Sequence, residues 1–253
     1  MTIKFITVNV WHGGRLMDNL IKFLQAEDPD ILVLQEAYND PRPELSARFR
    51  TVETLQMAAG LPHASFAASF MHVMPDLRTD QGNAVLSKFE LTPGAVTFFH
   101  TPYDPDYSEE GRTDFSRAPR NLQHVVAHTP AGDMNVFNLH GIWDLEGDRY
   151  SPERARMTEA IIRATHGLPR VILAGDTNAT MGNKAIAVVE EQLMNVFGHE
   201  LTTTFNMRRK DNPGYATAVV DMIFVSPDIK VLSKDCPDVD ASDHLPLVAT
   251  LEV

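Results

Sequence analysis

Two groups of polar residues stand beside apolar runs, where a folded chain would place them at the end of a strand. Ser242-Asp243-His244 precedes the apolar residues 245–251, and Gly175-Asp176-Thr177-Asn178 follows the apolar residues 171–174. Side chains at strand ends can converge on one cleft, so an acid beside an imidazole can meet an acid that lies two residues from an amide. Carboxylate and amide oxygens are ligands for hard cations. The pattern therefore favours hydrolysis assisted by a metal ion.

Further residues carry chemistry of the same kind. Glu36 comes at the end of an aliphatic strand candidate, residues 31–34, where an isolated carboxylate is costly to bury unless it meets a cation. Asp221 interrupts the apolar strand candidate 219–225, so it needs a buried partner, and a histidine is the natural one. His140 lies at the end of another strand candidate, on the face shared by alternate residues.

Each of these signals also has a simpler interpretation. Gly-Asp-x-Asn is often a turn, because glycine, aspartate and asparagine all favour turns. Glu36 by itself could be a solvated acid at a strand end, and Asp243-His244 could be a surface pair. Pro246 and the apolar run after it restrict the geometry of that pair. The joint occurrence of these signals favours a catalytic site.

The composition is that of an ordinary globular protein, with 43% hydrophobic and 22% charged residues among 253. The formal net charge of −12 argues against a protein that grips polyanions by bulk electrostatics. It leaves room for one that holds a phosphate locally through a metal ion. Cys236 is the single cysteine, which excludes an intrachain disulfide and a zinc site made of several thiolates from this chain.

Residues 1–5 show no basic segment followed by an apolar one, and no apolar run approaches the length needed to span a membrane. We therefore expect a cytoplasmic, reducing location and no membrane insertion. No sequence feature indicates an obligate protein partner.

Strand and helix signals alternate along the chain, which predicts an α/β fold. Residues 2–11 are apolar on both faces, as in a strand that is covered on two sides. Apolar residues at helical spacing follow over residues 16–24, and Pro29 ends that segment. A second helical pattern over residues 151–167 leads into the strand candidate 171–174. A helix, a turn, a short strand and an acid thus occur once in each half, which suggests a pseudo-symmetric pair of sheets.

Other strand candidates lie between and after these units. They are residues 83–87, 96–99, 122–127, 134–140, 219–225 and 247–253. Residues 100–119 are rich in proline and charge, which indicates an exposed functional or mobile loop. No linker or low-complexity tract divides the chain, so we predict a single domain over residues 1–253.

Taken in their order along the chain, the polar residues resemble the motifs of the endonuclease/exonuclease/phosphatase family, whose fold is that of pancreatic deoxyribonuclease I. The matching segments are Val8-Asn9-Val10-Trp11, Leu34-Gln35-Glu36, Gly82-Asn83-Ala84-Val85-Leu86-Ser87, Asn138-Leu139-His140, Gly175-Asp176-Thr177-Asn178, Val220-Asp221-Met222-Ile223-Phe224-Val225-Ser226 and Ser242-Asp243-His244. They span nearly the whole chain. The resemblance implies a four-layer α/β sandwich of two packed, mostly antiparallel mixed β-sheets flanked by helices, with the active site at one end.

The resemblance also implies a divalent metal ion. Family members hold Mg²⁺ or Mn²⁺ with the residue that matches Glu36, helped by those that match Asn9 and Asp243. This set of ligands is rich in oxygen, which favours octahedral Mg²⁺ or Mn²⁺ over tetrahedral zinc.

The remaining matches imply catalytic roles. The residue that matches Asp176 orients or deprotonates the attacking water, and Asn178 would support the phosphate and the metal ion. His140 would bind the scissile phosphate and stabilise its developing charge, together with His244, which Asp221 would orient. This division of roles agrees with the physical chemistry of phosphate-ester hydrolysis.

Some positions depart from the patterns of the DNA-repair and inositol-polyphosphate branches of the family. After His140 the chain reads Gly141-Ile142-Trp143-Asp144. Asp144 either joins a second metal ion or caps a turn, and we favour the turn. Arg120 is the expected phosphate ligand, with Arg112 and Arg117 as competitors. Residues 103–120 contain no recognisable match to the tyrosine or acid that nucleases use beside the phosphate.

These features predict a phosphoesterase dependent on Mg²⁺ or Mn²⁺, which hydrolyses a phosphodiester in the manner of a nuclease, by in-line attack of water. A phosphomonoesterase, or a lipid- or inositol-phosphate phosphatase, is the alternative. A catalytically silent binding module on the same fold is disfavoured, because the matching acids and both histidines are present. The expected partner is a phosphate ester, with nucleic acid among the candidates: Arg208-Arg209-Lys210 either follows a phosphate backbone or forms a solvated loop.

Overall fold

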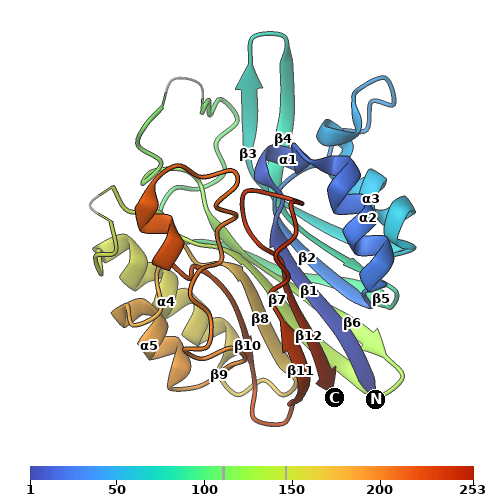
Figure 1. Cartoon of the computed structure of the whole chain (residues 1–253), viewed down its shortest axis with the longest axis vertical. Coiled ribbons are helices and arrows are strands. Elements are labelled where there is room, and N and C mark those ends of the chain that lie inside the picture. The colour runs from blue at the N-terminus through green and yellow to red at the C-terminus, as the bar shows by residue number, and fades with distance from the viewer. Residues whose placement is uncertain (110–111, 146) are drawn as a thin grey trace.

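The computed structural model describes residues 1–109, 112–145 and 147–253, and over these ranges two six-stranded β-sheets pack face to face (Figure 1). The first sheet contains, in spatial order, β11 (Lys230–Asp235), β12 (Leu247–Glu252), β1 (Thr2–Asn9), β2 (Ile31–Tyr38), β4 (Leu77–Ser87) and β3 (His63–Met74). The second contains β5 (Glu90–Phe98), β6 (Asn121–Thr129), β7 (Gly132–His140), β8 (Val171–Asp176), β10 (Asp221–Val225) and β9 (Met194–Asn195). One parallel pair lies within each sheet, β1 with β2 and β7 with β8, so both sheets are mixed and mostly antiparallel.

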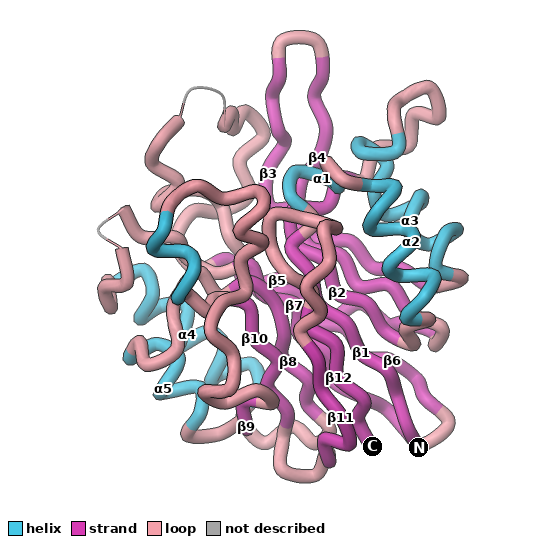
Figure 2. The backbone as a smooth tube through the Cα atoms, viewed as in Figure 1, coloured by secondary structure: helices cyan, strands magenta, loops and turns pink. Residues whose placement is uncertain are grey.

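Helices cover the outer face of each sheet, as Figure 2 shows. The helices α2 (Met17–Glu27) and α3 (Thr51–Ala59) pack on the first sheet, and α4 (Pro152–Thr165) and α5 (Lys184–Glu190) pack on the second. The short helices α1 (Trp11–Gly14), η1 (Ala47–Arg50) and η2 (Pro213–Thr217) lie in connections. The predicted four-layer α/β sandwich is confirmed.

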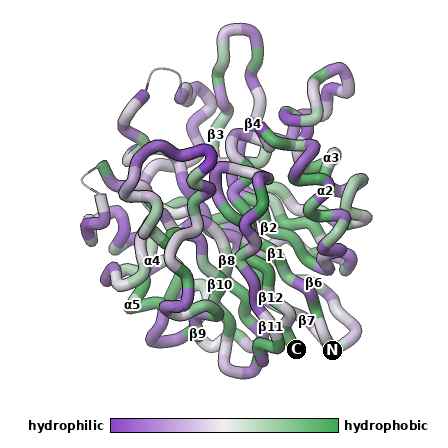
Figure 3. Tube along the Cα trace, in the orientation of Figure 1, coloured by the Kyte–Doolittle hydropathy of each residue, from purple (hydrophilic) through white to green (hydrophobic). Residues whose placement is uncertain are grey.

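Apolar contacts join the four layers. Phe5 and Val33 of the first sheet share a fully buried core with Val136 of the second. Leu24 of α2 and Ile161 of α4 belong to the two outer cores, each between a helix and a sheet. Central strands therefore need apolar side chains on both faces, which is why they form continuous apolar runs in the sequence. Figure 3 shows these strands as hydrophobic and the connections above them as largely hydrophilic.

The same unit occurs in both sheets. A parallel pair of strands is joined through a helix, by β1–α2–β2 in the first sheet and by β7–α4–β8 in the second. Parallel strands need such a crossover connection. The repeated unit agrees with the predicted pseudo-symmetric pair of sheets, and it carries Glu36 near the end of β2 and Asp176 at the end of β8.

Several elements differ from the sequence-based expectations. The strand β1 ends at Asn9, because Trp11 and His12 adopt left-handed backbone conformations with φ of 59° and 48°. The strand β10 begins at Asp221 itself. The strands β3 and β11 and the helices α3 and α5 were not predicted. The largely exposed edge strand β11 lacks the clear apolar alternation that identifies a strand.

The connection between β5 and β6 was predicted to be an exposed functional or mobile loop, and its described residues are mostly exposed or half-buried, with a few buried; residues 110 and 111 lie outside the described residues. Tyr107 and Ala118 pack against Phe70 of β3. The hairpin of β3 and β4 extends beyond the sandwich beside this connection (Figure 1). Within the described ranges, no helix is both long enough and apolar enough to cross a membrane.

Candidate active site

A β-bulge in β2 turns Glu36 toward the end of the sandwich. The register of β2 against β4 shifts between Leu34 and Ala37, and Glu36 has a φ of 59°, in the left-handed region that non-glycine residues rarely adopt. Its carboxylate accepts hydrogen bonds from Asn9 Nδ2 at 3.1 Å and from the backbone N–H of His12 at 2.7 Å. The bulge and these two donors hold the carboxylate in one orientation.

Asp176 comes to the same place from the second sheet. Asn9 Nδ2 also donates to Asp176 Oδ2 at 3.1 Å, and the backbone N–H of Asn178 donates to Oδ1 at 2.9 Å. Gly175 precedes it with a φ of 140°, and a Cβ there would lie 2.0 Å from the carbonyl oxygen of Leu139. Glycine therefore lets β8 approach β7 closely enough to bring the carboxylate to Asn9.

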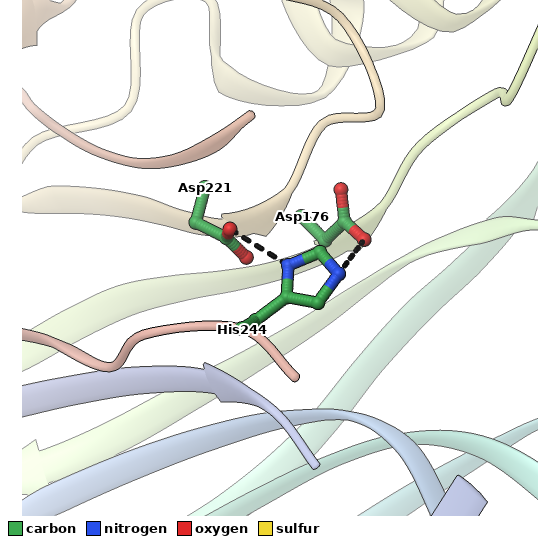
Figure 4. Close-up of side chains that lie close together, drawn as sticks. All are labelled: Asp176, Asp221 and His244. Atoms are coloured by element: carbon green, nitrogen blue, oxygen red, sulfur yellow. Dashed lines mark hydrogen bonds and ion pairs between the residues drawn. The ribbon is translucent and has the colours of Figure 1, made fainter. Parts of the chain in front are cut away.

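The ring of His244 lies between two buried carboxylates (Figure 4). Its Nδ1 is 2.8 Å from Asp221 Oδ2, and its Nε2 is 4.0 Å from Asp176 Oδ2. Ligand-type atoms of these three residues all lie within 4.8 Å of one another, a spacing that could hold a metal ion. The short hydrogen bond already engages the His244 ring with Asp221, which supports the predicted Asp–His pair.

The charges around this pair set its pKa values. Burial raises the pKa of Asp176 to about 6, although the nearby His244 lowers it. Burial lowers the pKa of His244, but the negative charge of Asp221 and then that of Asp176 raise it to about 10. At neutral pH, the site therefore holds a protonated histidine beside a carboxyl group whose pKa is close to the surrounding pH.

His140 and Arg120 complete this wall of the site. His140 Nε2 lies 3.7 Å from Asp176 Oδ2. Burial, and then the charge of Arg120, lower the pKa of His140 well below its ordinary value. Arg120 is buried, and its Nε has no hydrogen-bond partner among the described residues. Of its competitors, Arg112 lies over an aromatic ring and Arg117 lines a neighbouring hollow.

Asp243 forms an ion pair that was not predicted from the sequence. Lys210 Nζ lies 2.5 Å from Asp243 Oδ2. The two residues before it, Arg208 and Arg209, instead pair with aspartates in more exposed positions. The basic run therefore does not form one continuous surface for a phosphate backbone.

One cleft of about 670 Å³ contains most of these groups. Eight of the nine predicted site residues line it: Asn9, Glu36, Arg120, His140, Asp176, Asn178, Asp243 and His244. Asp221 is buried and contacts the cleft through His244. Asp144 also lines the cleft, in a turn where its carbonyl oxygen accepts the N–H of Gly147 at 3.1 Å, and its carboxylate is 3.8 Å from Arg149 Nε.

His12 and Glu109 also line the cleft, and neither was predicted. His12 Nδ1 lies 3.3 Å from Glu109 Oε2 and 3.6 Å from Glu36 Oε2. Burial lowers the pKa of His12, but these two acids raise it above its ordinary value overall. Burial alone would raise the pKa of Glu36. Nearby positive charges, of which that of His12 has the largest effect, instead bring the pKa well below its ordinary value. His12 could have been predicted from its position three residues after Asn9. Glu109 lies in an irregular segment where no sequence pattern marks it as a site residue.

Comparisons with known proteins show which family and which solved structures this chain resembles. A model of the Endonuclease/Exonuclease/phosphatase family matches residues 6–244. No curated protein is similar enough in sequence to match the chain. An endonuclease/exonuclease/phosphatase from Beutenbergia cavernae DSM 12333 has a TM-score of 0.72 and 20% identity, over 100% of this chain and 72% of that chain.

Two further structures similar to this chain have more specific names. The mannosyl-6-phosphatase Bt3783 of Bacteroides thetaiotaomicron VPI-5482 has a TM-score of 0.66 and 18% identity, over 99% of this chain and 100% of that one. A humanized D. rerio TDP2 has a TM-score of 0.65 and 17% identity, over 100% of this chain and 99% of that one. At these identities the likeness concerns the fold.

Proposed function

Because the chain belongs to the endonuclease/exonuclease/phosphatase family, whose members are hydrolases that act on phosphoester bonds, we propose that it is a phosphodiesterase dependent on Mg²⁺ or Mn²⁺. Water would attack phosphorus in line, so that a P–O bond forms as the ester bond on the opposite side breaks. The observation that carries the proposal is the pairing of Asp176, whose pKa is about 6, with the protonated His244 at 4.0 Å. A base with a pKa near neutral suits proton removal from water, and a fixed cation suits a developing negative charge.

The residues proposed for the metal ion fit a hard cation. Glu36 and Asp243 present carboxylate oxygens to the same cleft, and the thiol of Cys236 is not among its lining groups. The Lys210 ammonium at 2.5 Å from Asp243 supports a position for positive charge there. Glu36 and Asp243 would hold the ion, and Asn9, which donates to Glu36, would keep that ligand in place. An ion held there would supply positive charge that offsets the negative charge of the phosphate.

Side chains of the protein carry the remaining catalytic roles. Asp176 accepts a proton from the attacking water, and the backbone N–H of Asn178 holds its carboxylate. His244, oriented by Asp221, donates to the phosphate and stabilises the charge that builds up on it. Arg120 lines the same cleft and contributes a further positive charge for the anion. The neutral ring of His140 offers a further hydrogen bond.

A substrate panel with Mg²⁺ or Mn²⁺ tests the proposal. It contains single- and double-stranded DNA, abasic DNA, RNA, a chromogenic phosphodiester, inositol phosphates, lipid phosphates and mannose 6-phosphate. We expect hydrolysis of a diester, loss of activity with EDTA, and recovery when the metal ion is restored. Cleavage of monoesters alone would replace the proposal with a phosphomonoesterase, and hydrolysis that persists in EDTA would contradict it.

The substitution Glu36→Gln tests the metal assignment. It removes the charge of the proposed principal ligand, so Mg²⁺ affinity measured by calorimetry should fall and most turnover should be lost. Glu53→Gln is the matched control, because Glu53 is an exposed residue of α3 that pairs with Arg50. Unchanged Mg²⁺ affinity in Glu36→Gln would contradict the assignment.

A further inference from the structure

We propose that the cleft takes a small phosphate ester with a planar ring close to phosphorus, and that Trp143 is the stacking partner of that ring. This inference rests on the proposed function, because it concerns the substrate of the same site.

Aromatic side chains gather around the site. Among the described residues that line the cleft, five are aromatic: Trp11, Phe115, Trp143, Phe205 and Tyr215. The chain has two tryptophans, and both are in this set. Trp143 is half-buried and meets Phe115 edge-to-face, with ring centroids 6.0 Å apart and planes at 85°. Such a pair fixes the indole plane and leaves a ring face for a ligand.

The segment that carries Trp143 is held in place from the interior. Arg154 is 2% exposed, and it donates through Nε to the carbonyl oxygen of Ile142 at 3.2 Å and through Nη2 to that of Asn178. Asn178 Nδ2 in turn donates to the carbonyl oxygen of Gly141 at 3.2 Å. The backbone just before Trp143 is therefore fixed before any ligand arrives, and a preorganised wall binds at a lower entropic cost.

The position of Trp143 in the chain bears on how far the ligand's ring lies from its phosphate. Trp143 lies three residues after His140, and an extended chain spans at most about 3.6 Å per residue. The two Cα atoms are thus no more than about 11 Å apart. This proximity favours a ring that is joined to phosphorus directly or through a spacer about the size of one sugar, if the ring stacks on Trp143 while its phosphate meets His140.

The charges favour a small molecule over a polymer. A cleft of about 670 Å³ has the size of a site for one small ligand. The net charge is −12, and Arg208 and Arg209 are paired with acids. An extended nucleic acid needs several unpaired cations along its path, whereas Arg120 and Lys210 line the cleft itself.

Calorimetry with phosphonates tests the inference without turnover, because their C–P bond is not an ester. Each ring-bearing ligand has a ring-free counterpart: phenylphosphonate with methylphosphonate, and the 5′-phosphonate analogue of adenosine with that of ribose. With Mg²⁺ present, we expect at least one ring-bearing ligand to bind about tenfold tighter than its counterpart, which corresponds to about 1.4 kcal/mol and lies within the range of ring stacking. The pair with the larger ratio tells whether the ring is attached to phosphorus directly or through a sugar.

Variants assign the effect to Trp143. Trp143→Ala should reduce the ring-bearing to ring-free ratio to about twofold or less and leave methylphosphonate affinity unchanged, whereas Trp143→Phe should keep most of the ratio. Tyr103→Ala is the control, because Tyr103 is an exposed aromatic residue of the same connection as Phe115 and lies outside the cleft. Circular dichroism checks that each variant is folded.

Three outcomes would overturn the inference: equal affinity for ring-bearing and ring-free ligands, a full ratio in Trp143→Ala, or a single-stranded tetranucleotide that binds far more tightly than the adenosine phosphonate. Each of them leaves the proposed function standing if metal-dependent hydrolysis of a phosphodiester is observed. Failure of the proposed function looks different, because the panel would then show no hydrolysis of a diester, or hydrolysis that persists in EDTA.

Discussion

Asp221→Asn removes the charge of the Asp221–His244 pair and keeps its shape. Asp221 Oδ2 lies 2.8 Å from His244 Nδ1, and both side chains are buried, so solvent screens the interaction little. The more distant Asp176 carboxylate, 4.0 Å from Nε2, stays in place. A hydrogen bond to a charged group contributes about 1.5–3 kcal/mol, which corresponds to about 1–2 pKa units. We therefore expect the pKa of His244 to fall from about 10 by that amount.

The same change predicts how stability depends on pH. Folding raises the pKa of His244 from its ordinary value of 6.5 to about 10, so the stabilisation from its protonation is complete below pH 6.5 and is lost as the pH rises through 10. Asp221→Asn should thus lower the free energy of unfolding by about 1.5–3 kcal/mol at pH 7. Because this loss of stability comes from the interaction with protonated His244, it should shrink toward zero at a pH about one unit above the wild-type pKa of His244.

Two measurements check this prediction in protein without added metal ions. An NMR titration follows His244, whose signal is identified by its loss in His244→Asn, and chemical denaturation at a series of pH values gives the free energy of unfolding. Asp238→Asn is the control, because Asp238 forms an exposed pair with Arg208, and such pairs contribute about 0–1 kcal/mol. An unchanged pKa of His244, or a stability loss that stays constant up to alkaline pH, would refute the reasoning.

Other predictions follow from the same geometry. Asp176→Asn should lower kcat by about 10²–10⁴ with little change in KM; near wild-type kcat in steady-state kinetics would transfer water activation to another acid. Lys210→Met removes the cation 2.5 Å from Asp243, so calorimetry should show Mg²⁺ binding several-fold more tightly, and unchanged or weaker binding would contradict that competition. His12→Asn keeps a residue that tolerates the left-handed backbone but removes the imidazole beside Glu36, and we expect kcat/KM to fall about tenfold with the melting temperature nearly unchanged. Wild-type kcat/KM would leave His12 without a catalytic role.

Residues at strand ends could be predicted from the sequence because apolar runs locate strands well. Glu36 and Asp176 follow such runs, and their carboxylates share the amide of Asn9 in the structure. Asp221 and His244 could be paired in advance because a buried acid needs a partner. In each case, the signal was a polar residue placed where an ordinary apolar core has none.

Trp143 and Glu109 could not be assigned, because each lies in an irregular segment that is held by distant contacts. Arg154 shows the difficulty: its position in the first turn of α4 is that of an ordinary exposed arginine, yet its side chain is buried and fixes the backbone before Trp143. Burying a guanidinium is costly unless backbone carbonyl oxygens satisfy it, and in the sequence nothing distinguishes those carbonyl oxygens from others. The general chemistry of this site is therefore encoded locally in the strands. The shape that would select its substrate is set by long-range hydrogen bonds, so chains with the same strand-end motifs can differ in specificity through residues such as Arg154 that hold the backbone around the cleft.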